Sequence, residues 1–219
     1  IITGVTGFIG YHLALFLANK GETIVGIDNN LRGGNESSLN SLKKAGVKFI
    51  ECDLCDFNML LEKCGNDLLR SKYIFHLAAY NGTQNFYKYP YKVIRNSSLS
   101  TANIVEFIVS NSIKSKLLYT GSSESYAESV NRKIEAIPTK ESALVSLGAI
   151  NNPRWSYACA KTYGEYLLSS AHIEHDINYV IGYDLIVFQF FFVFYFFQIV
   201  DTHYFYKLNK IIFHNLTPL

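Results

Sequence analysis

Short apolar runs recur along the first 182 residues, and stretches with helical spacing separate them. The short runs predict strands at residues 1–2, 23–28, 47–52, 73–79, 116–120 and 177–181. Apolar residues at helical spacing predict helices over residues 8–19, 91–110 and 155–172. Because strand and helix alternate, we expect an α/β fold built on a doubly wound parallel sheet with right-handed crossovers.

One stretch inside this pattern has no regular period. Residues 127–152 are polar and irregular, and Pro138 and Pro153 act as breakers of regular structure. Loops that rigid elements position often carry function. We therefore predict a loop over the active site here.

The pattern changes again after residue 182, so we divide the chain into residues 1–182 and 183–219. Of the last 37 residues, 13 are Phe or Tyr, and no period of 2 or 3.6 organises them. A membrane anchor is the first interpretation, and it needs roughly 20 apolar residues. The run from Leu185 to Val200 is 16 residues long, and two of these are the polar Gln189 and Gln198. A buried element of a remodelled domain is a second interpretation. We favour a third, an error of reading frame or gene assignment near Gly182.

Composition narrows the class of protein. A length of 219 residues suits one α/β domain, or a domain plus a fragment, and a net charge of +2 without a Lys/Arg cluster indicates no nucleic-acid partner. The Cys52–Cys55 pair lacks the second pair that zinc needs, so we expect no metal and reduced thiols. No signal peptide precedes the first strand, and we expect a cytoplasmic protein. The chain starts without Met inside a strand, so we expect a fragment whose own N-terminus is missing.

Three glycines stand between the first predicted strand and the first predicted helix. Gly4, Gly7 and Gly10 follow a G-x-x-G-x-x-G spacing, which is typical of a dinucleotide-binding turn whose helix N-terminus faces a pyrophosphate. Gly4 supplies the bend, Gly7 lets the backbone approach the phosphates, and Gly10 lets the helix lie close to the sheet. The triplet alone is a weak motif, so its context decides its meaning.

Asp28 supplies part of that context. It ends the second predicted strand about 20 residues after the glycines, where a carboxylate accepts hydrogen bonds from both ribose hydroxyls of adenosine. The alternative is a solvated aspartate in a turn. A carboxylate at this position repels a 2′-phosphate, so the sequence favours NAD over NADP.

Tyr157 and Lys161 lie at positions i and i+4 of the last predicted helix, on one face. A tyrosine is a poor base because its usual pKa is about 10. A neighbouring ammonium and a positive nicotinamide ring favour the phenolate and bring that pKa into a working range. An amphipathic helix can contain this pair by chance, but the glycine turn and a serine-rich strand end before it strengthen the motif.

With these motifs in order, the chain resembles an extended short-chain dehydrogenase/reductase of the NAD-dependent epimerase/dehydratase group, which remodels nucleotide-sugars. The matching motifs lie at residues 3–10, 28, 53–54, 76–79, 120–126 and 154–161. The resemblance implies a Rossmann-like NAD-binding domain with a catalytic Tyr/Lys helix over residues 1–182. Members continue with an Asn-Val-Tyr-Gly-Pro segment and a substrate domain, so we expect that C-terminal domain to be missing or truncated here.

The resemblance also implies which residues bind NAD. They are Gly4, Thr6, Gly7, Phe8, Ile9, Gly10, Asp28, Asn29, Asp53, Leu54, Leu77, Ala78, Ala79, Tyr157 and Lys161. Asp53 and Leu54 flank the adenine in this interpretation, and Asn81 lies close to the substrate. The family gives His76 no clear catalytic role, so we expect a structural, packed histidine there.

The catalytic residues implied by the resemblance are Ser122, Ser123, Glu124, Tyr157 and Lys161. Ser122 bonds the sugar hydroxyl that is oxidised, Tyr157 removes its proton, and Lys161 bonds the nicotinamide ribose and lowers the pKa of the phenol.

Glu124 bears on which reaction follows the oxidation. The 4,6-dehydratases and the nucleotide-uronate decarboxylases carry a glutamate at this position, whereas simple 4-epimerases usually do not. Ser123 stands where many dehydratases hold an aspartate, and Arg154 and Trp155 resemble the decarboxylases. A solvated loop carboxylate is the structural alternative for Glu124.

The implied activity is oxidation of the sugar at C4 with a recycled NAD, followed by epimerisation, dehydration or decarboxylation. The implied partners are a nucleotide-sugar and, for the intact protein, a second copy joined through two long helices from each subunit; a membrane partner is not expected. Two other interpretations remain open: a non-catalytic NAD-binding fragment, and a membrane-attached enzyme.

Overall fold

The computed structural model describes residues 1–31 and 36–183. The aromatic stretch, and with it the three interpretations of residues 184–219, lies outside the described residues. Within them the strands form one parallel sheet in the order β3-β2-β1-β4-β5-β6. The strands are β1 (Ile2–Thr3), β2 (Val25–Asp28), β3 (Lys48–Glu51), β4 (Tyr73–His76), β5 (Lys116–Gly121) and β6 (Asn178–Tyr183). The predicted α/β fold with a doubly wound parallel sheet is confirmed.

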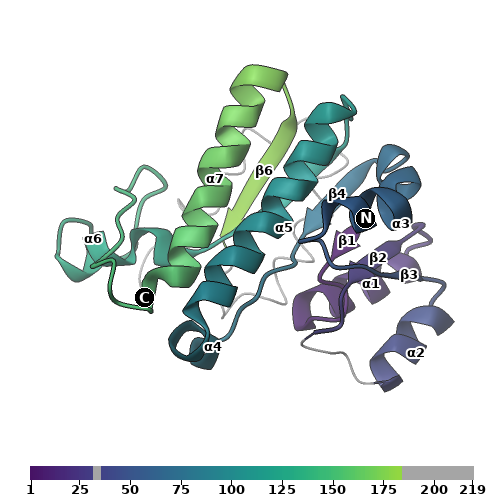
Figure 1. Ribbon diagram of the computed structural model, residues 1–219, viewed down its shortest axis with the longest axis horizontal. Coiled ribbons are helices and arrows are strands. Elements are labelled where there is room, and N and C mark those ends of the chain that lie inside the picture. The colour runs from purple at the N-terminus through teal and green to yellow at the C-terminus, as the bar shows by residue number, and fades with distance from the viewer. Residues whose placement is uncertain (32–35, 184–219) are drawn as a thin grey trace, which may run out of the picture.

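The helices connect these strands (Figure 1). They are α1 (Phe8–Asn19), α2 (Glu36–Lys44), α3 (Phe57–Leu69), α4 (Thr83–Lys88), α5 (Pro90–Ser110), the 3-10 turn η1 (Ser123–Tyr126), α6 (Ala127–Asn131) and α7 (Trp155–His175). The strand predicted over residues 73–79 ends at His76, and the helix predicted over 155–172 continues to His175. The ends of strands and helices are defined by backbone hydrogen bonds, which the pattern of apolar residues does not predict.

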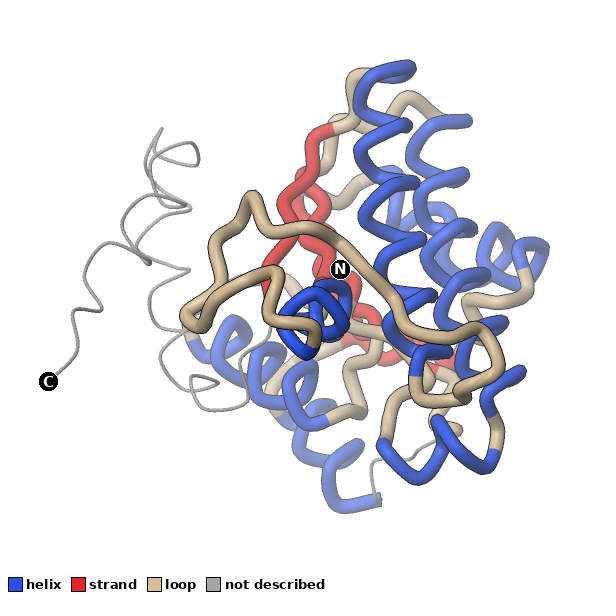
Figure 2. The backbone as a smooth tube through the Cα atoms, turned by 90° about the vertical axis from the view of Figure 1, so that its left-hand side faces the viewer, coloured by secondary structure: helices blue, strands red, loops and turns tan. Residues whose placement is uncertain are grey.

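The segment 127–152, predicted as irregular, begins with the short helix α6. Glu128 and Arg132 form an ion pair between positions i and i+4 at this helix, with Oε1 and Nε 2.8 Å apart. A single polar turn carries no apolar periodicity, which is why the sequence pattern missed it. The rest of the connection to α7 has no long regular element, as Figure 2 shows from the α6 side.

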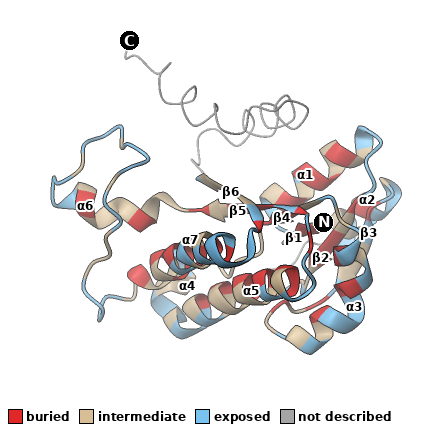
Figure 3. Ribbon diagram, turned by 90° about the horizontal axis from the view of Figure 1, so that it is seen from above, coloured by how far each residue is buried: buried red, intermediate tan, exposed pale blue. Residues whose placement is uncertain are grey.

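Two layers of helices cover the sheet. Figure 3 shows α1 and α2 on one face and α3, α5 and α7 on the other. Successive residues of a strand point to opposite faces; accordingly Phe75 joins the core under α1, and its neighbour Ile74 joins the core under α3 and α5. None of the described helices is long and apolar enough to cross a bilayer.

The strand order reverses between β1 and β4, because the chain moves outward through β2 and β3 and then returns to the other side of β1. In open α/β sheets this reversal leaves a crevice beyond the carboxyl ends of the strands. The candidate site lies there.

Candidate active site

A cavity of about 560 Å³ opens beyond the carboxyl ends of the strands. Its walls come from the glycine turn, from the ends of β2, β3, β4 and β5, and from the first turns of α7. Among its lining residues are all those predicted to bind the cofactor: Gly4, Thr6, Gly7, Phe8, Ile9, Gly10, Asp28, Asn29, Asp53, Leu54, Leu77, Ala78, Ala79, Tyr157 and Lys161. Residues 150 positions apart in sequence therefore face one space.

The glycine turn is closely packed. Gly4 has φ +71°, and a Cβ there would lie 2.8 Å from the Ala78 nitrogen. A Cβ on Gly10 would lie 2.2 Å from the Gly4 carbonyl oxygen, which is well inside contact distance. Only glycine fits at these two positions. Gly7 is the N-cap of α1 and provides no side-chain cap for its first amides, so the helix begins at the cavity with backbone donors that suit an anion such as a pyrophosphate.

The Asp28 carboxylate is held by two backbone amides. Oδ2 accepts a hydrogen bond from the Thr6 amide at 3.0 Å, and Oδ1 accepts one from the Asn30 amide at 2.8 Å. Each oxygen keeps a second lone pair, so a ribose with two hydroxyls can still donate to it. Across the cavity, Asp53 is oriented in a similar way, because its Oδ1 accepts from the Cys55 amide at 3.0 Å.

Lys161 lies at the inner end of the cavity and is only 2% exposed. Its Nζ donates to the Thr120 carbonyl oxygen at 2.7 Å and contacts Thr120 Oγ1 at 3.3 Å. The same atom is 4.6 Å from the centre of the Tyr119 ring and 5.7 Å from the centre of the Tyr157 ring. The buried ammonium is thus fixed beside the tyrosine that shares its helical face.

The ring of Tyr157 has a neighbour that the sequence pattern did not reveal. Phe86 of α4 stacks on it, with ring centres 5.0 Å apart and an interplanar angle of 14°. Phe86 lies 71 residues before Tyr157 in the chain, and α4 is only 6 residues long. Neither a motif nor periodicity could have identified the contact.

Ser122, Ser123 and Glu124 lie at the end of β5 and in η1, and they are not among the residues that line the cavity. Ser122 is the N-cap of η1, because its Oγ accepts from the Glu124 amide at 3.2 Å. The Glu124 carboxylate is paired with Arg154, whose Nη2 lies 3.1 Å and 3.0 Å from its two oxygens. The guanidinium carbon of Arg154 is 5.3 Å from the centre of the Trp155 ring. Glu124 is therefore an ion-paired carboxylate that remains partly exposed.

His76 has the packed position expected for a structural residue. Its Nδ1 is 2.8 Å from Thr3 Oγ1, and its Nε2 is 3.1 Å from Thr101 Oγ1. Thr101 Oγ1 donates its own proton to the Ser97 carbonyl oxygen, so it accepts from Nε2, and Nδ1 accepts from Thr3. Burial, together with the nearby positive charge of Lys161, lowers the pKa of His76 to about 3. The imidazole is neutral and links β1, β4 and α5.

Several further residues line the cavity. Those beyond the predicted cofactor set are Leu31, Cys52, Cys55, Tyr80, Asn81, Asn96, Ser100, Thr120 and Gly121. Asn81 was expected near the substrate. Asn96 and Ser100 lie four residues apart on α5, but they stand among several other polar residues of that helix, so the sequence pattern did not single them out. All four cysteines of the chain are free thiols.

Comparison with known proteins shows which protein family this sequence matches. The model of the family described as "NAD dependent epimerase/dehydratase family" matches residues 1–184. One similar curated protein is UDP-glucuronate 4-epimerase 1 of Arabidopsis thaliana, 27% identical over 201 residues, which are 89% of this chain and 42% of the relative. Another is the UDP-N-acetyl-alpha-D-glucosaminuronate decarboxylase of Bacillus cytotoxicus, 29% identical over 167 residues, with 76% and 48% covered.

The fold is also similar to solved structures. The UDP-glucose 4-epimerase of Thermotoga maritima matches with a TM-score of 0.67 and 23% identity, over 82% of this chain and 53% of that one. The chain thus spans about half the length of the curated relatives and of the solved structure.

Proposed function

Because the chain belongs to the NAD-dependent epimerase/dehydratase family, we propose that it oxidises the C4 hydroxyl of a nucleotide-sugar, with Tyr157 as the base and NAD as a recycled cofactor. The observation that carries the proposal is the shared cavity: Tyr157 and Lys161 face the same space as the glycine turn and Asp28. A base and a dinucleotide site in one space are what a hydride transfer requires.

The residues present suit NAD. The α1 N-terminus at Gly7 offers amides to the pyrophosphate, and Gly4 and Gly10 leave no side chain in its way. Asp28 would accept hydrogen bonds from the adenosine ribose and would repel a 2′-phosphate, which favours NAD over NADP. Asp53 and Leu54 would hold the adenine, and residues 77–79 would hold the nicotinamide side.

The proton is handled by the chain's own side chains. Tyr157, in its deprotonated phenolate form, takes the proton of the C4 hydroxyl. The adjacent Lys161 ammonium stabilises this phenolate. Ser122 accepts a hydrogen bond from the Glu124 amide, so its own O–H is left to donate to the sugar oxygen. Bound NAD would supply the hydride acceptor for C4 and, because the hydride returns to the sugar, would act as a recycled cofactor.

The ion pair at Glu124 favours some reaction outcomes over others. Dehydration needs a base that removes the proton at C5, but the guanidinium of Arg154 engages both oxygens of Glu124. Epimerisation at C4, and loss of carbon dioxide from a β-keto uronate, need no such base. The arrangement therefore supports an epimerase or a decarboxylase, and the relatives above, a UDP-glucuronate 4-epimerase and a UDP-N-acetyl-alpha-D-glucosaminuronate decarboxylase, favour a nucleotide-uronate as the substrate.

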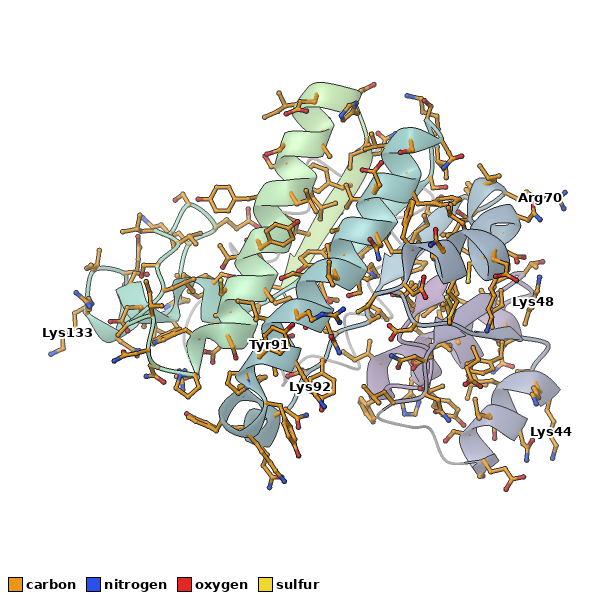
Figure 4. The ribbon with its side chains drawn as sticks, in the orientation of Figure 1. Lys44, Lys48, Arg70, Tyr91, Lys92 and Lys133 are labelled. Carbon is orange, nitrogen blue, oxygen red and sulfur yellow. The ribbon has the colours of Figure 1, made fainter. Side chains whose placement is uncertain are left out.

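The exposed side of two long helices supports a homodimer. Tyr91 on α5, and Tyr163 and Tyr166 on α7, are exposed aromatic residues, and α5 and α7 pack side by side in Figure 1. Tyr91 projects outward near the start of α5 (Figure 4). Exposed aromatic residues of this kind are enriched in subunit interfaces.

A second candidate function is an NAD-binding protein without turnover. The activities of the two relatives belong to the whole proteins, of which the chain covers 42% and 48%, so turnover by this chain needs its own test.

Binding and turnover, measured on the 219-residue chain, separate the two candidates. Calorimetry with NAD and with NADP tests the cofactor, and incubation with NAD and a panel of UDP-hexoses and UDP-uronates, followed by mass spectrometry of the products, tests the reaction. NAD binding with product formation supports the enzyme, and NAD binding without any product supports the second candidate. A folded protein that binds neither dinucleotide contradicts both.

A further inference from the structure

A carboxylate that the proposed mechanism does not use lies one helical turn after Lys161. Glu165 of α7 is partly buried and is joined to two other segments of the chain. Its Oε1 accepts a hydrogen bond from Ser125 Oγ at 3.0 Å, and its Oε2 accepts one from Tyr183 Oη at 2.8 Å. Each oxygen therefore holds a different segment against α7.

These segments frame the candidate catalytic residues. Ser125 belongs to η1, the turn that begins after Ser122 and contains Glu124, and Tyr183 is the last residue of β6. Glu165 thus connects the helix that carries Tyr157 with the turn that carries Ser122.

The space around Glu165 is closed on the side of β5. A Cβ built on Gly121 would lie 3.2 Å from Glu165 Oε1, 3.0 Å from Tyr183 Cε1 and 2.9 Å from Ile181 Cγ2. A side chain at residue 121 would therefore crowd Ile181, Tyr183 and the carboxylate. This packing leaves Glu165 little freedom to adopt another rotamer.

Burial dominates the electrostatics of Glu165 and raises the pKa of its carboxyl group above the usual value. The hydrogen bonds from Tyr183 and Ser125 and the positive charge of Lys161 act in the opposite direction. These contacts therefore compensate part of the cost of burying the carboxyl group.

We infer that Glu165 is a positioning residue for the proposed reaction: it fixes the Ser122–Ser125 turn relative to Tyr157 and Lys161 through Ser125 and Tyr183. The inference rests on the proposed function, since the hydroxyl of Ser122 and the phenol of Tyr157 must meet at one sugar oxygen. A displacement of about 1 Å between such groups costs on the order of a hundredfold in rate.

The first test measures the turn itself and does not depend on turnover. Hydrogen exchange, followed by mass spectrometry, reports the amides of Ser125 and Ala127, which donate within η1 to the carbonyl oxygens of Ser122 and Glu124. In Glu165→Gln, which keeps the side-chain volume, we expect exchange in this turn to be faster by at least about tenfold, with the peptides of α1 unchanged. The matched control is Glu174→Gln on the exposed side of α7, and it leaves exchange in the turn unchanged.

The second test measures the reaction. In Glu165→Gln we expect kcat to fall by about 10- to 100-fold. KM and the dissociation constant of NAD should stay within about twofold of the wild type, because the change removes no contact with the bound substrate or cofactor. Tyr183→Phe removes a single hydroxyl and keeps the packing, so it should produce a smaller fall of the same kind. Ser125→Ala should add little to Glu165→Gln, because the two residues act through one contact.

Unchanged exchange in the turn of Glu165→Gln overturns the inference, whatever the activity. So does faster exchange with an unchanged kcat, because the residue would then be structural only. The proposed function fails on different observations, namely a wild-type chain that binds no NAD or forms no product.

Discussion

Arg154 Nη2 lies 3.0 Å and 3.1 Å from the two carboxylate oxygens of Glu124. The pair joins the start of α7 to η1, so it spans the two elements that carry the candidate base and the candidate hydroxyl donor. Both side chains remain partly exposed, at 42% and 34%. Pairs with this exposure contribute little to folding, so loss of the contact should cost the protein little stability.

Replacing Arg154 should change the products more than the fold. In Arg154→Ala, Glu124 is released from the guanidinium and becomes able to take a proton at C5, so with a UDP-hexose, whose C6 hydroxyl can leave as water, we expect a dehydrated sugar among the products. The free energy of unfolding should fall by less than about 1 kcal/mol, the usual range for an exposed ion pair. Mass spectrometry of the products and urea unfolding measure the two effects.

The control is Arg132→Ala, which breaks the exposed ion pair with Glu128 at α6, away from Tyr157. It should leave the products unchanged. An Arg154→Ala protein with wild-type products would remove the reason for preferring an epimerase or decarboxylase.

The glycine turn should tolerate no side chain at Gly10. A Cβ there would lie 2.2 Å from the Gly4 carbonyl oxygen and 2.9 Å from Val5 Cα, both backbone atoms. We expect Gly10→Ala to destabilise the protein by about 1–3 kcal/mol or more and to abolish NAD binding, measured by thermal unfolding and calorimetry. Gly21→Ala is the matched control, since its φ is +86° but nothing lies within 4 Å of its Cβ position; it should cost about 1 kcal/mol and leave NAD binding intact. NAD binding by Gly10→Ala would contradict the packing described for this turn.

His76 should make the stability of the protein depend on pH. Its pKa falls from 6.5 to about 3 on folding, so between these values the unfolded chain binds a proton that the native protein does not. Its contribution is fully present above pH 6.5 and is lost as the pH falls toward 3. The expected slope is about 1.4 kcal/mol per pH unit.

Urea unfolding at pH 4, 5 and 6 measures this slope in the wild type and in His76→Gln. Thr3 and Thr101 lose their hydrogen-bond partner in the variant, which lowers its free energy of unfolding. The change of that free energy per pH unit should be smaller in the variant than in the wild type by about 1.4 kcal/mol. Equal slopes would mean that His76 is protonated in the native protein.

Sequence patterns predicted the parts of the site that depend on neighbours in the chain. The glycine turn, Asp28 at a strand end and the Tyr157/Lys161 pair follow from spacing, because a strand end, a helix start and one helical face are local properties. The sheet followed from the alternation of elements.

Contacts between distant residues could not be predicted in this way. The stacking of Phe86 on Tyr157, the pairing of Arg154 with Glu124 and the hydrogen bond from Ser125 to Glu165 join residues 71, 30 and 40 positions apart. Each depends on how α4, η1 and α7 pack, and no local period encodes that packing. The same holds for α6, whose single polar turn carries no apolar stripe.

The most direct test of the central claim compares Tyr157→Phe with the wild type. The change removes one hydroxyl, and the ring still stacks on Phe86, so the dissociation constant of NAD measured by calorimetry should stay within about twofold. Turnover of the nucleotide-sugar that the wild type accepts should fall by about a thousandfold or more, because general-base catalysis typically contributes 10²–10⁴-fold. Turnover near the wild-type rate in a protein that still binds NAD would contradict the assignment of Tyr157 as the base.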